Sequence, residues 1–308
     1  MIQRKARSDL VRHASWRTEH ISHQALAVLA VTRAPTMRCG RLIRLVVVVV
    51  FTVLAAHAQD NYEIQVYSSE MDPPGTTTLE LHSNFTAQGQ NSVRDGVAPT
   101  NHAMHETLEV SHGFTEWFDT GIYLFTTIQP DSGWHFVGSH IHPRVTVPES
   151  WHWPLGLSLG QEIGYQRRQF SENTWTYELQ PILDKKIGRW YVAFNPTFDR
   201  ALHGNDVHLG WEFSPNAKVS YAFTKKIAGG LEYYGGLGPA TEFYPLNRQH
   251  HQFFPSVDLD LSPKWELNFG VGWDPNHASD HLIVKFIVGR RFSWGGKRDR
   301  ENNETTKK

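Results

Sequence analysis

The stretch Val207-His-Leu-Gly-Trp-Glu-Phe-Ser-Pro-Asn-Ala-Lys-Val-Ser-Tyr-Ala-Phe223 alternates between two kinds of side chain. Odd positions carry apolar side chains or proline, and the even positions between them carry polar or small ones. Because successive side chains of a strand point to opposite faces, this pattern predicts a β-strand with one apolar face. Its seventeen residues exceed the roughly five or six of an ordinary globular strand, whereas a tilted strand that crosses a bilayer needs about 9 to 11.

The same alternation recurs along the chain, with turn residues between the copies. Twelve segments show it, at 76–86, 103–114, 117–129, 134–147, 155–168, 174–185, 189–200, 206–223, 227–237, 251–261, 264–274 and 280–293. The connections alternate between short turns and longer loops, as in barrels that span a membrane. We therefore predict an all-β fold, a transmembrane antiparallel up-and-down β-barrel of about 12 strands over residues 76–293.

The residues before the barrel region have the three-part layout of a secretory signal peptide. Arg38, Arg41 and Arg44 precede an apolar run over 45–56, and Ala56-His57-Ala58 follows as a small-x-small cleavage site. The run of 12 residues is shorter than the roughly 20 that a membrane-spanning helix needs. We predict a signal peptide at 37–58 and Sec-type export.

The remaining segments are assigned by composition. Residues 1–36 are basic without sustained periodicity, which predicts an over-extended gene start or a disordered segment, with a cytoplasmic extension as the alternative. We predict a periplasmic N-terminal segment at 59–75 and a disordered polar tail at 294–308.

Charge and cysteine content exclude some classes of partner. The chain has 30 Lys and Arg against 31 Asp and Glu, and removal of residues 1–58 leaves 21 against 29, a net charge of −8. An acidic chain without a basic tract predicts no nucleic-acid partner. The single cysteine, Cys39, precedes the apolar run, so the exported chain has no disulfide and no cysteine for a lipid anchor. No cofactor is predicted.

Tryptophan provides an independent indication. The side chains beside predicted short turns are Trp117, Trp151, Trp153, Trp190, Trp265 and Trp294, and those beside longer loops are Trp134, Trp175 and Trp273. Only Trp211 is expected in the middle of a strand. Because indole prefers the level of the lipid headgroups, two girdles favour a membrane barrel over the alternative, a large soluble β domain.

Several strand motifs resemble a known class of protein. The last strand, His281-Leu-Ile-Val-Lys-Phe-Ile-Val-Gly-Arg-Arg-Phe292, resembles the terminal strand that barrel-assembly machinery recognises, although a tail follows its final aromatic residue. The stretches Thr77-Thr-Leu-Glu-Leu-His82, Glu109-Val-Ser-His-Gly-Phe-Thr-Glu-Trp-Phe118 and Leu231-Glu-Tyr-Tyr-Gly235 resemble uncharacterised bacterial outer-membrane barrels, similar to transporters associated with phenol meta-cleavage pathways.

The resemblance implies a place in the bacterial outer membrane. Outer-membrane lipid, the barrel-assembly machinery and a small-molecule solute are then the expected partners. Because the shared motifs are strand and turn patterns, the solute and the oligomeric state stay open.

If the apolar face of each strand meets lipid, the alternate positions face the lumen. These predicted lumen residues are Glu80, His82, Glu109, Asp119, His140, His142, Arg144, Glu162, Glu178, Asp184, Asp199, Glu212, Lys218, Glu232, Asp258, Asp260, Glu266, Lys285 and Arg291. Their acids outnumber their bases by twelve to four. They form either a wet acidic passage that disfavours anions or a plug of paired groups, and a barrel of this size allows both.

Other residues suggest rival functions. His140 and His142 share one face, with His82 and His208 on other strands, which is a conceivable metal site, although we predict none. Ser83 and His112 point outward on neighbouring strands, so a membrane-embedded lipid hydrolase is an alternative, as is a structural or surface barrel. We predict no catalytic residue.

Glycines recur at lumen positions of the predicted strands. They are Gly138, Gly156, Gly160, Gly164, Gly210, Gly230, Gly236, Gly270 and Gly272. They either relieve curvature where the sheet closes or create space for a solute.

Together these observations predict a channel or transporter for small neutral, aromatic or cationic solutes, which is not an enzyme. Its gate is expected in the loop residues 101–105 and 243–251.

Overall fold

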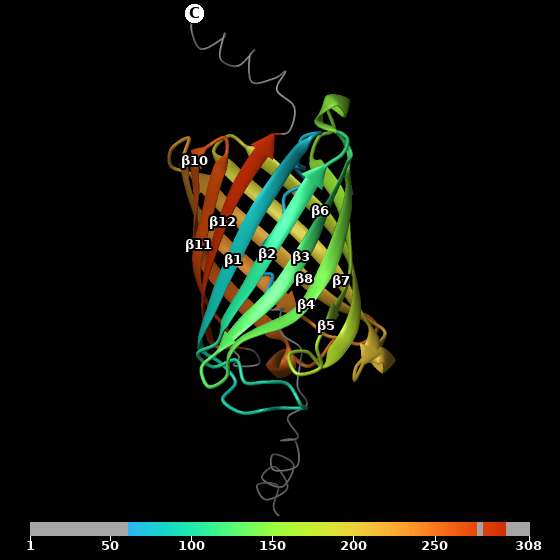
Figure 1. Ribbon diagram of the computed structural model, residues 1–308. Helices are drawn as coiled ribbons and strands as arrows, with labels where there is room; N and C mark the ends of the chain where they lie inside the picture. Colours follow the sequence, from blue (N-terminus) through green and yellow to red (C-terminus); the bar gives the residue numbers. More distant parts are fainter. Residues whose placement is uncertain (1–60, 276–279, 294–308) are drawn as a thin grey trace, which may run out of the picture. The chain divides into compact units, whose positions relative to one another are not determined.

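The structure is a computed structural model that describes residues 61–275 and 280–293. They form a closed barrel in which each strand pairs antiparallel with its sequence neighbours and β1 pairs with β12 (Figure 1). The strands are β1 (Thr76–Gln88), β2 (Met104–Gly113), β3 (Phe118–Gln129), β4 (Gly133–Thr146), β5 (Gly156–Gln166), β6 (Asn173–Ile187), β7 (Trp190–Gly204), β8 (Trp211–Ala222), β9 (Ile227–Gly236), β10 (His250–Ser262), β11 (Trp265–Trp273) and β12 (Leu282–Ser293). The predicted up-and-down barrel of 12 strands is confirmed.

Some predicted segments lie outside the described residues. These are the signal peptide at 37–58, the stretch 1–36 and the tail 294–308. None of the helices in the described ranges is long and apolar enough to cross a membrane.

The two ends of the barrel carry different connections. The turn side, as we name it, has the connections 114–117, 147–155, 188–189, 223–226 and 263–264, and the 3₁₀ helix η1 (Glu149–Trp151) lies in the second of them. The loop side has the connections 89–103, 130–132, 167–172, 205–210, 237–249 and 274–281, with the 3₁₀ helices η2 (Val207–Leu209) and η3 (Leu246–Arg248).

Strand β3 shows how the alternating sequence becomes two surfaces. Ile122 and Leu124 point outward and are 52% and 40% exposed, whereas Tyr123 and Phe125 point into the barrel and are 1% and 0% exposed. Large apolar side chains are exposed in the same way on the other strands, including Leu81, Val110, Ile141, Ile163, Val192, Val219, Leu231, Val257, Phe269 and Phe286. Since soluble proteins rarely expose a contiguous apolar surface of this extent, the outer face fits hydrocarbon rather than water.

One predicted strand is wrong at its start. The segment 206–223 was expected to be continuous, but Val207–Leu209 is a 3₁₀ helix, Gly210 has a φ of 77°, and β8 begins at Trp211. An alternating sequence shows which side chains share a face, but it does not show whether a neighbouring strand is there to pair with. The pairing of β8 with β7 ends at Arg200 and Trp211, so the residues before Trp211 are not part of the strand. Trp211 therefore lies at the loop side of its strand rather than in the middle.

The tryptophans of the described residues follow the expected girdles. Exposed indoles lie beside the turn side at Trp117, Trp151, Trp153, Trp190 and Trp265, and beside the loop side at Trp134, Trp175 and Trp273.

The predicted periplasmic segment at 59–75 is wrong for residues 61–72, which lie inside the barrel and are named here the lumen segment. Tyr62, Ile64 and Val66 are buried against the wall. The Asn61 side chain donates to Asp280 on the loop side, and the Gly75 amide donates to the Gly113 carbonyl on the turn side. The chain therefore crosses the lumen from one end to the other before it turns back into β1.

A charge on the outer face should be costly only at mid-depth. Leu124→Arg places a guanidinium halfway along β3 and is expected to lower the free energy of unfolding in lipid by about 2–4 kcal/mol, because the group meets hydrocarbon. Thr120→Arg lies on the same face of the same strand, near the turn side, and is expected to cost about 0–1 kcal/mol. Denaturant titration in liposomes checks both, and equal costs would contradict a membrane-spanning β3.

Candidate functional site

The lumen segment divides the interior into two cavities. The loop-side cavity has a volume of about 620 Å³, and Asn61, Tyr62 and Glu63 form part of its wall. The turn-side cavity has a volume of about 470 Å³ and is lined by segment residues from Gln65 to Asp72. Ile64 lines neither cavity and is only 1% exposed, so it marks the partition between them.

Apolar packing closes the partition. Ile64 and Val66 pack in one buried cluster with wall side chains, namely Ala193, Tyr234, Phe254 and Ile283. Tyr62 packs in a second cluster, with Tyr123, Phe125 and Val137. Side chains with alternating spacing in the lumen segment thus fill the barrel at mid-height.

Wall side chains also bind the backbone of the lumen segment. Donors from five strands reach six carbonyl groups: Asn84 to Asn61 (2.8 Å), Thr107 to Tyr62 (2.6 Å), Lys285 to Ile64 (3.1 Å), Asn195 to Tyr67 (3.1 Å), Arg144 to Ser68 (3.2 Å) and Thr146 to Ser69 (3.0 Å). Asn195 also accepts a hydrogen bond of 2.8 Å from the Tyr67 amide. Its amide group therefore pairs with Tyr67 in the way that a neighbouring strand would.

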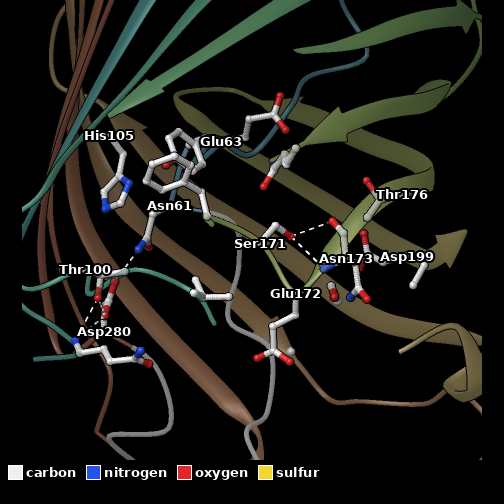
Figure 2. A pocket seen from close by; sticks show the side chains of 18 of the residues that line it. Asn61, Glu63, Thr100, His105, Ser171, Glu172, Asn173, Thr176, Asp199 and Asp280 are labelled. Atoms are coloured by element: carbon white, nitrogen blue, oxygen red, sulfur yellow. Dashed lines mark hydrogen bonds between the residues drawn. The ribbon is translucent and has the colours of Figure 1, made fainter. Parts of the chain in front are cut away.

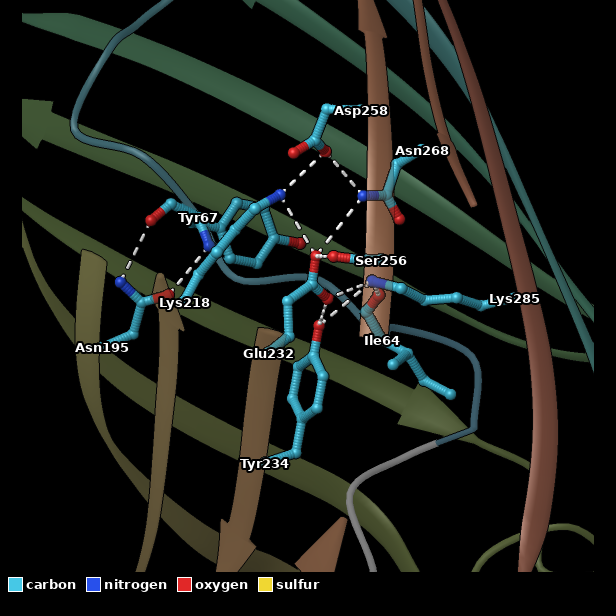
Figure 3. Close-up of polar contacts among 10 residues, drawn as sticks. All are labelled: Ile64, Tyr67, Asn195, Lys218, Glu232, Tyr234, Ser256, Asp258, Asn268 and Lys285. Carbon is cyan, nitrogen blue, oxygen red and sulfur yellow. Dashed lines mark hydrogen bonds and ion pairs between the residues drawn. The ribbon is translucent and has the colours of Figure 1, made fainter. Parts of the chain in front are cut away.

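A polar network surrounds Glu232 beside the partition (Figure 3). Its carboxylate is 1% exposed and is paired with Lys285 and, at 3.1 Å, with Lys218. The neutral donors are Tyr234 at 2.7 Å, Ser256 at 2.9 Å and Asn268 at 3.3 Å. Because the Lys285 ammonium also donates to the Ile64 carbonyl, this network ties the wall to the lumen segment.

A second attachment lies at the loop side. Asp280 accepts hydrogen bonds from Asn61 and, at 2.5 Å, from the Thr100 hydroxyl, so the segment and two loops meet there (Figure 2). Burial raises the pKa of the Asp280 carboxyl above its ordinary value, although these hydrogen bonds act in the opposite direction.

Acidic side chains form a row across four adjacent strands of the loop-side cavity. In the register, Glu162 on β5 lies opposite Glu178 on β6, Glu178 opposite Asp199 on β7, and Asp199 opposite Glu212 on β8. All four line the loop-side cavity. The row therefore gathers acidic side chains on one side of the cavity.

The other predicted lumen residues are distributed unevenly. Those that line the turn-side cavity are Glu80, Glu109, Asp119, His142, Arg144, Asp184, Lys218, Glu232, Asp258, Asp260, Glu266, Lys285 and Arg291, and His140 lines the loop-side cavity. His82 is buried and lines neither, with its Nε2 atom 3.3 Å from Glu80 and 3.5 Å from Glu109.

All four predicted lumen bases are on the turn side, and each is paired with an acid. Arg144 pairs with Asp119 at 2.7 Å and Arg291 with Glu266 at 3.0 Å. Lys218 pairs with Asp258 at 2.8 Å in addition to Glu232, and Lys285 pairs with Glu232. Paired charges therefore line the turn-side cavity, and the loop-side cavity carries more acids than bases.

Several lumen glycines leave room for large neighbouring side chains. A Cβ atom on Gly164 would lie 1.8 Å from Cδ2 of His140, and one on Gly160 would lie 2.5 Å from Nε2 of His142. A Cβ atom on Gly272 would lie 2.2 Å from Phe254. These glycines make room for neighbouring side chains, whereas we expected them to relieve sheet curvature or to create space for a solute. Gly210 lies in a loop and not in a strand.

The conceivable histidine site is not formed as expected. His140 and His142 both face the lumen, but His82 is held between Glu80 and Glu109, and His208 is exposed in η2. Among the described residues, two mixed clusters bring ligand-type atoms within 4.8 Å of one another, namely Glu63, His140 and Glu162, and Glu80, His82 and Glu109. Glu63 escaped prediction because it belongs to the lumen segment.

Ser83 and His112, the pair considered for a lipid hydrolase, are not close to each other. Ser83 lies opposite Glu106 and donates to its carboxylate at 2.7 Å, whereas His112 lies opposite Thr77 and contacts its hydroxyl at 2.8 Å. Ser83 and Thr77 are six positions apart on β1, which corresponds to about 20 Å at the usual rise of a strand. His112 therefore does not activate Ser83.

Comparisons with known proteins give distant similarity to solved structures. No protein-family model and no curated protein matches the sequence. An outer-membrane channel from Pseudomonas putida F1 has a TM-score of 0.49 and 13% identity, over 75% of this chain and 100% of that chain. The NanC porin has a TM-score of 0.48 and 9% identity, over 70% and 100%. The calcium-bound dimer of the Salmonella typhi outer membrane phospholipase has a TM-score of 0.41 and 11% identity, over 76% and 94%. None of these similarities decides the function of this chain.

The space beside Gly164 yields a test of the wall. Gly164→Ala is expected to lower the free energy of unfolding by about 1–3 kcal/mol, because the new methyl group displaces the His140 ring. Gly121→Ala is the control, since its methyl group would come no closer than 3.2 Å to Tyr123 and 3.5 Å to Glu109, and should cost less than about 1 kcal/mol.

A double-mutant cycle tests whether displacement of the His140 ring causes the loss of stability in Gly164→Ala. Addition of His140→Ala should recover about 1 kcal/mol or more of the loss in Gly164→Ala, measured by denaturant titration. No coupling between the two sites would show that the ring does not occupy this space.

Proposed function

We propose that this chain is a bacterial outer-membrane channel for small cationic or neutral solutes, in which the lumen segment is a displaceable constriction. The observation that carries the proposal is the pair of cavities at opposite ends of one barrel, separated at mid-height where Tyr62, Ile64 and Val66 of the lumen segment pack against wall side chains. Displacement of the segment would take its side chains out of this partition and widen the connection between the cavities.

The contacts that hold the lumen segment support a constriction that can be displaced rather than one that is permanently closed. The wall holds the lumen segment by noncovalent contacts, with side chains as donors. Hydrogen bonds of this kind contribute about 0.5–1.5 kcal/mol each, and water in an open lumen would replace them.

The charge of the loop-side cavity supports the choice of solute. Seven acids line it, Glu63, Glu162, Glu172, Glu178, Asp199, Glu212 and Asp280, against the two bases Arg94 and Arg200. A cavity wall of one sign raises the local concentration of the opposite charge. Anions are therefore disfavoured, and aromatic solutes, which we also expected, have no further support from the cavity walls.

The arrangement of the ends supports an orientation. In outer-membrane barrels the short turns face the periplasm and the longer loops face outward. The acidic cavity would then receive solute from outside, past Thr100, His105 and Tyr244 on its wall. These residues lie in or beside the loops 101–105 and 243–251, which stay our predicted gate.

Displacement of the lumen segment should open the channel. Ile64→Asp places a carboxylate among apolar side chains at the partition, where an unpaired charge is unfavourable. The single-channel conductance in planar lipid bilayers is expected to rise at least about twofold, because the segment leaves its position. Ile64→Leu keeps the apolar contact and should behave as the wild type. No conductance in either the wild type or Ile64→Asp would refute the channel.

Selectivity should depend on the acidic row. With a KCl gradient across the bilayer, the reversal potential of the wild type is expected to indicate preference for K⁺ over Cl⁻, because the carboxylates concentrate cations. The combined variant Glu178→Gln, Asp199→Asn and Glu212→Gln should shift the reversal potential toward zero. A variant of the turn side, Asp260→Asn, is the control. A wild type that prefers Cl⁻ would contradict the proposed solute class.

A further inference from the structure

Glu63, His140 and Glu162 meet in the loop-side cavity, and they come from separate parts of the fold. Glu63 belongs to the lumen segment, His140 to β4 and Glu162 to β5, and one ligand-type atom of each lies within 4.8 Å of the others. All three line the loop-side cavity, so a solute that reaches the cavity reaches them. Figure 2 shows the Glu63 carboxyl group on the wall of this cavity.

The imidazole of the cluster is held in a fixed position. His140 is 7% exposed, its Nδ1 atom contacts Glu162, and its ring lies at right angles to Phe125 with the centroids 4.6 Å apart. The absence of a side chain on Gly164 admits the ring. Its Nε2 atom is buried without a hydrogen-bond partner among the described residues. The ring is therefore positioned by packing and by the Nδ1 contact with Glu162.

The donor set determines which ligand fits. Two carboxylates and one imidazole bring a charge of −2 when the ring is neutral, which requires a cation. Imidazole suits Zn²⁺, Ni²⁺, Cu²⁺ and Fe²⁺, whereas Ca²⁺ and Mg²⁺ prefer oxygen ligands only. Three protein ligands beside a cavity leave a coordination position for water or solute, as in zinc sites that remain open.

The second mixed cluster is a poorer candidate. His82 is 1% exposed and lines neither cavity, and Glu80 and Glu109 already interact with its Nε2 atom. All three side chains belong to β1 and β2, so this cluster is part of the wall and does not involve the lumen segment. It serves as an internal comparison.

We infer that Glu63, His140 and Glu162 bind one divalent transition-metal ion, which joins the lumen segment to the wall. The ion attracts both carboxylates to one shared charge. Since only Glu63 among the three is on the segment, a bound ion holds the segment in place. The inference concerns binding to the closed barrel and does not require that the barrel conducts.

Zinc binding tests the inference directly. Folded, tag-free protein in detergent is titrated with ZnCl₂ in a buffer that does not chelate metals, and isothermal calorimetry is expected to show one saturable site per chain. His140→Ala, Glu162→Gln and Glu63→Gln should each weaken binding about tenfold or more. Retained heat-modifiable migration in gel electrophoresis confirms that each variant is folded.

The matched control is Glu178→Gln. Glu178 lines the same cavity and lies directly opposite Glu162 in the register, but it is not in the cluster. Its loss should change zinc affinity by no more than about twofold, because it alters only the general charge of the cavity. A loss equal to that of Glu162→Gln would overturn the site in favour of diffuse attraction.

Hydrogen exchange tests the link to the lumen segment. Zn²⁺ should slow amide exchange in a peptide that contains residues 61–67 of the wild type and leave the Glu63→Gln variant unaffected. Undiminished zinc affinity in Glu63→Gln, or equal slowing of exchange in both proteins, would overturn the inference that the ion joins segment to wall. Absence of saturable zinc binding to the wild type would overturn the site itself, whatever the conductance.

Discussion

A chain segment inside a barrel must find partners for its backbone, because the wall strands have already used their own amide and carbonyl groups in pairing with each other. The structure meets this constraint with side chains. Asn84, Thr107, Lys285, Asn195, Arg144 and Thr146 approach the lumen segment from strands on different sides of the barrel. Binding therefore needs the closed barrel, since the donors on β1, β2 and β12 are brought to one segment only by the pairing of β1 with β12.

The same constraint explains the unequal charge of the two halves. A buried base is tolerated when an acid pairs with it, and the four lumen bases are all in such pairs on the turn side. Removal of one partner of Arg144, Lys218 or Lys285 would leave an unpaired buried charge, so these pairs are suited to a fixed structural role. The acidic row on the loop side lines a cavity with seven acids and two bases, and a wall of one sign attracts the opposite charge. The turn-side half therefore carries the paired charges, and the loop-side half carries the acidic row, whereas contacts to the segment occur in both halves.

Period-two alternation was sufficient to predict the strands and the residues that face the lumen, because each inward position follows from the one before it. It was not sufficient for the lumen segment, although Tyr62, Ile64 and Val66 alternate with Glu63 and Gln65 in the same way. The pattern predicts an apolar face, but it does not predict whether this face contacts lipid or the inner wall of the barrel. Partners such as Lys285 and Ile64, 221 positions apart, depend on barrel register and closure, which no local pattern contains. The alternation around Val207 led to the wrong prediction of a strand there, because the pairing of β8 with β7 does not extend to Val207.

Displacement of the segment and binding of a metal ion act on the same equilibrium. In the proposed channel, six carbonyl contacts at about 0.5–1.5 kcal/mol each and the burial of apolar side chains at about 1.5–3 kcal/mol each favour the closed state. An agent that opens the barrel must favour the displaced state by about 5.5 kcal/mol to move it from 1% to 99% open. A cation held by Glu63, His140 and Glu162 adds to the closed state, because displacement removes one of its three ligands. A transition-metal ion is therefore expected to act as a brake, whereas a cation that binds only the row from Glu178 to Glu212 leaves the segment free to move.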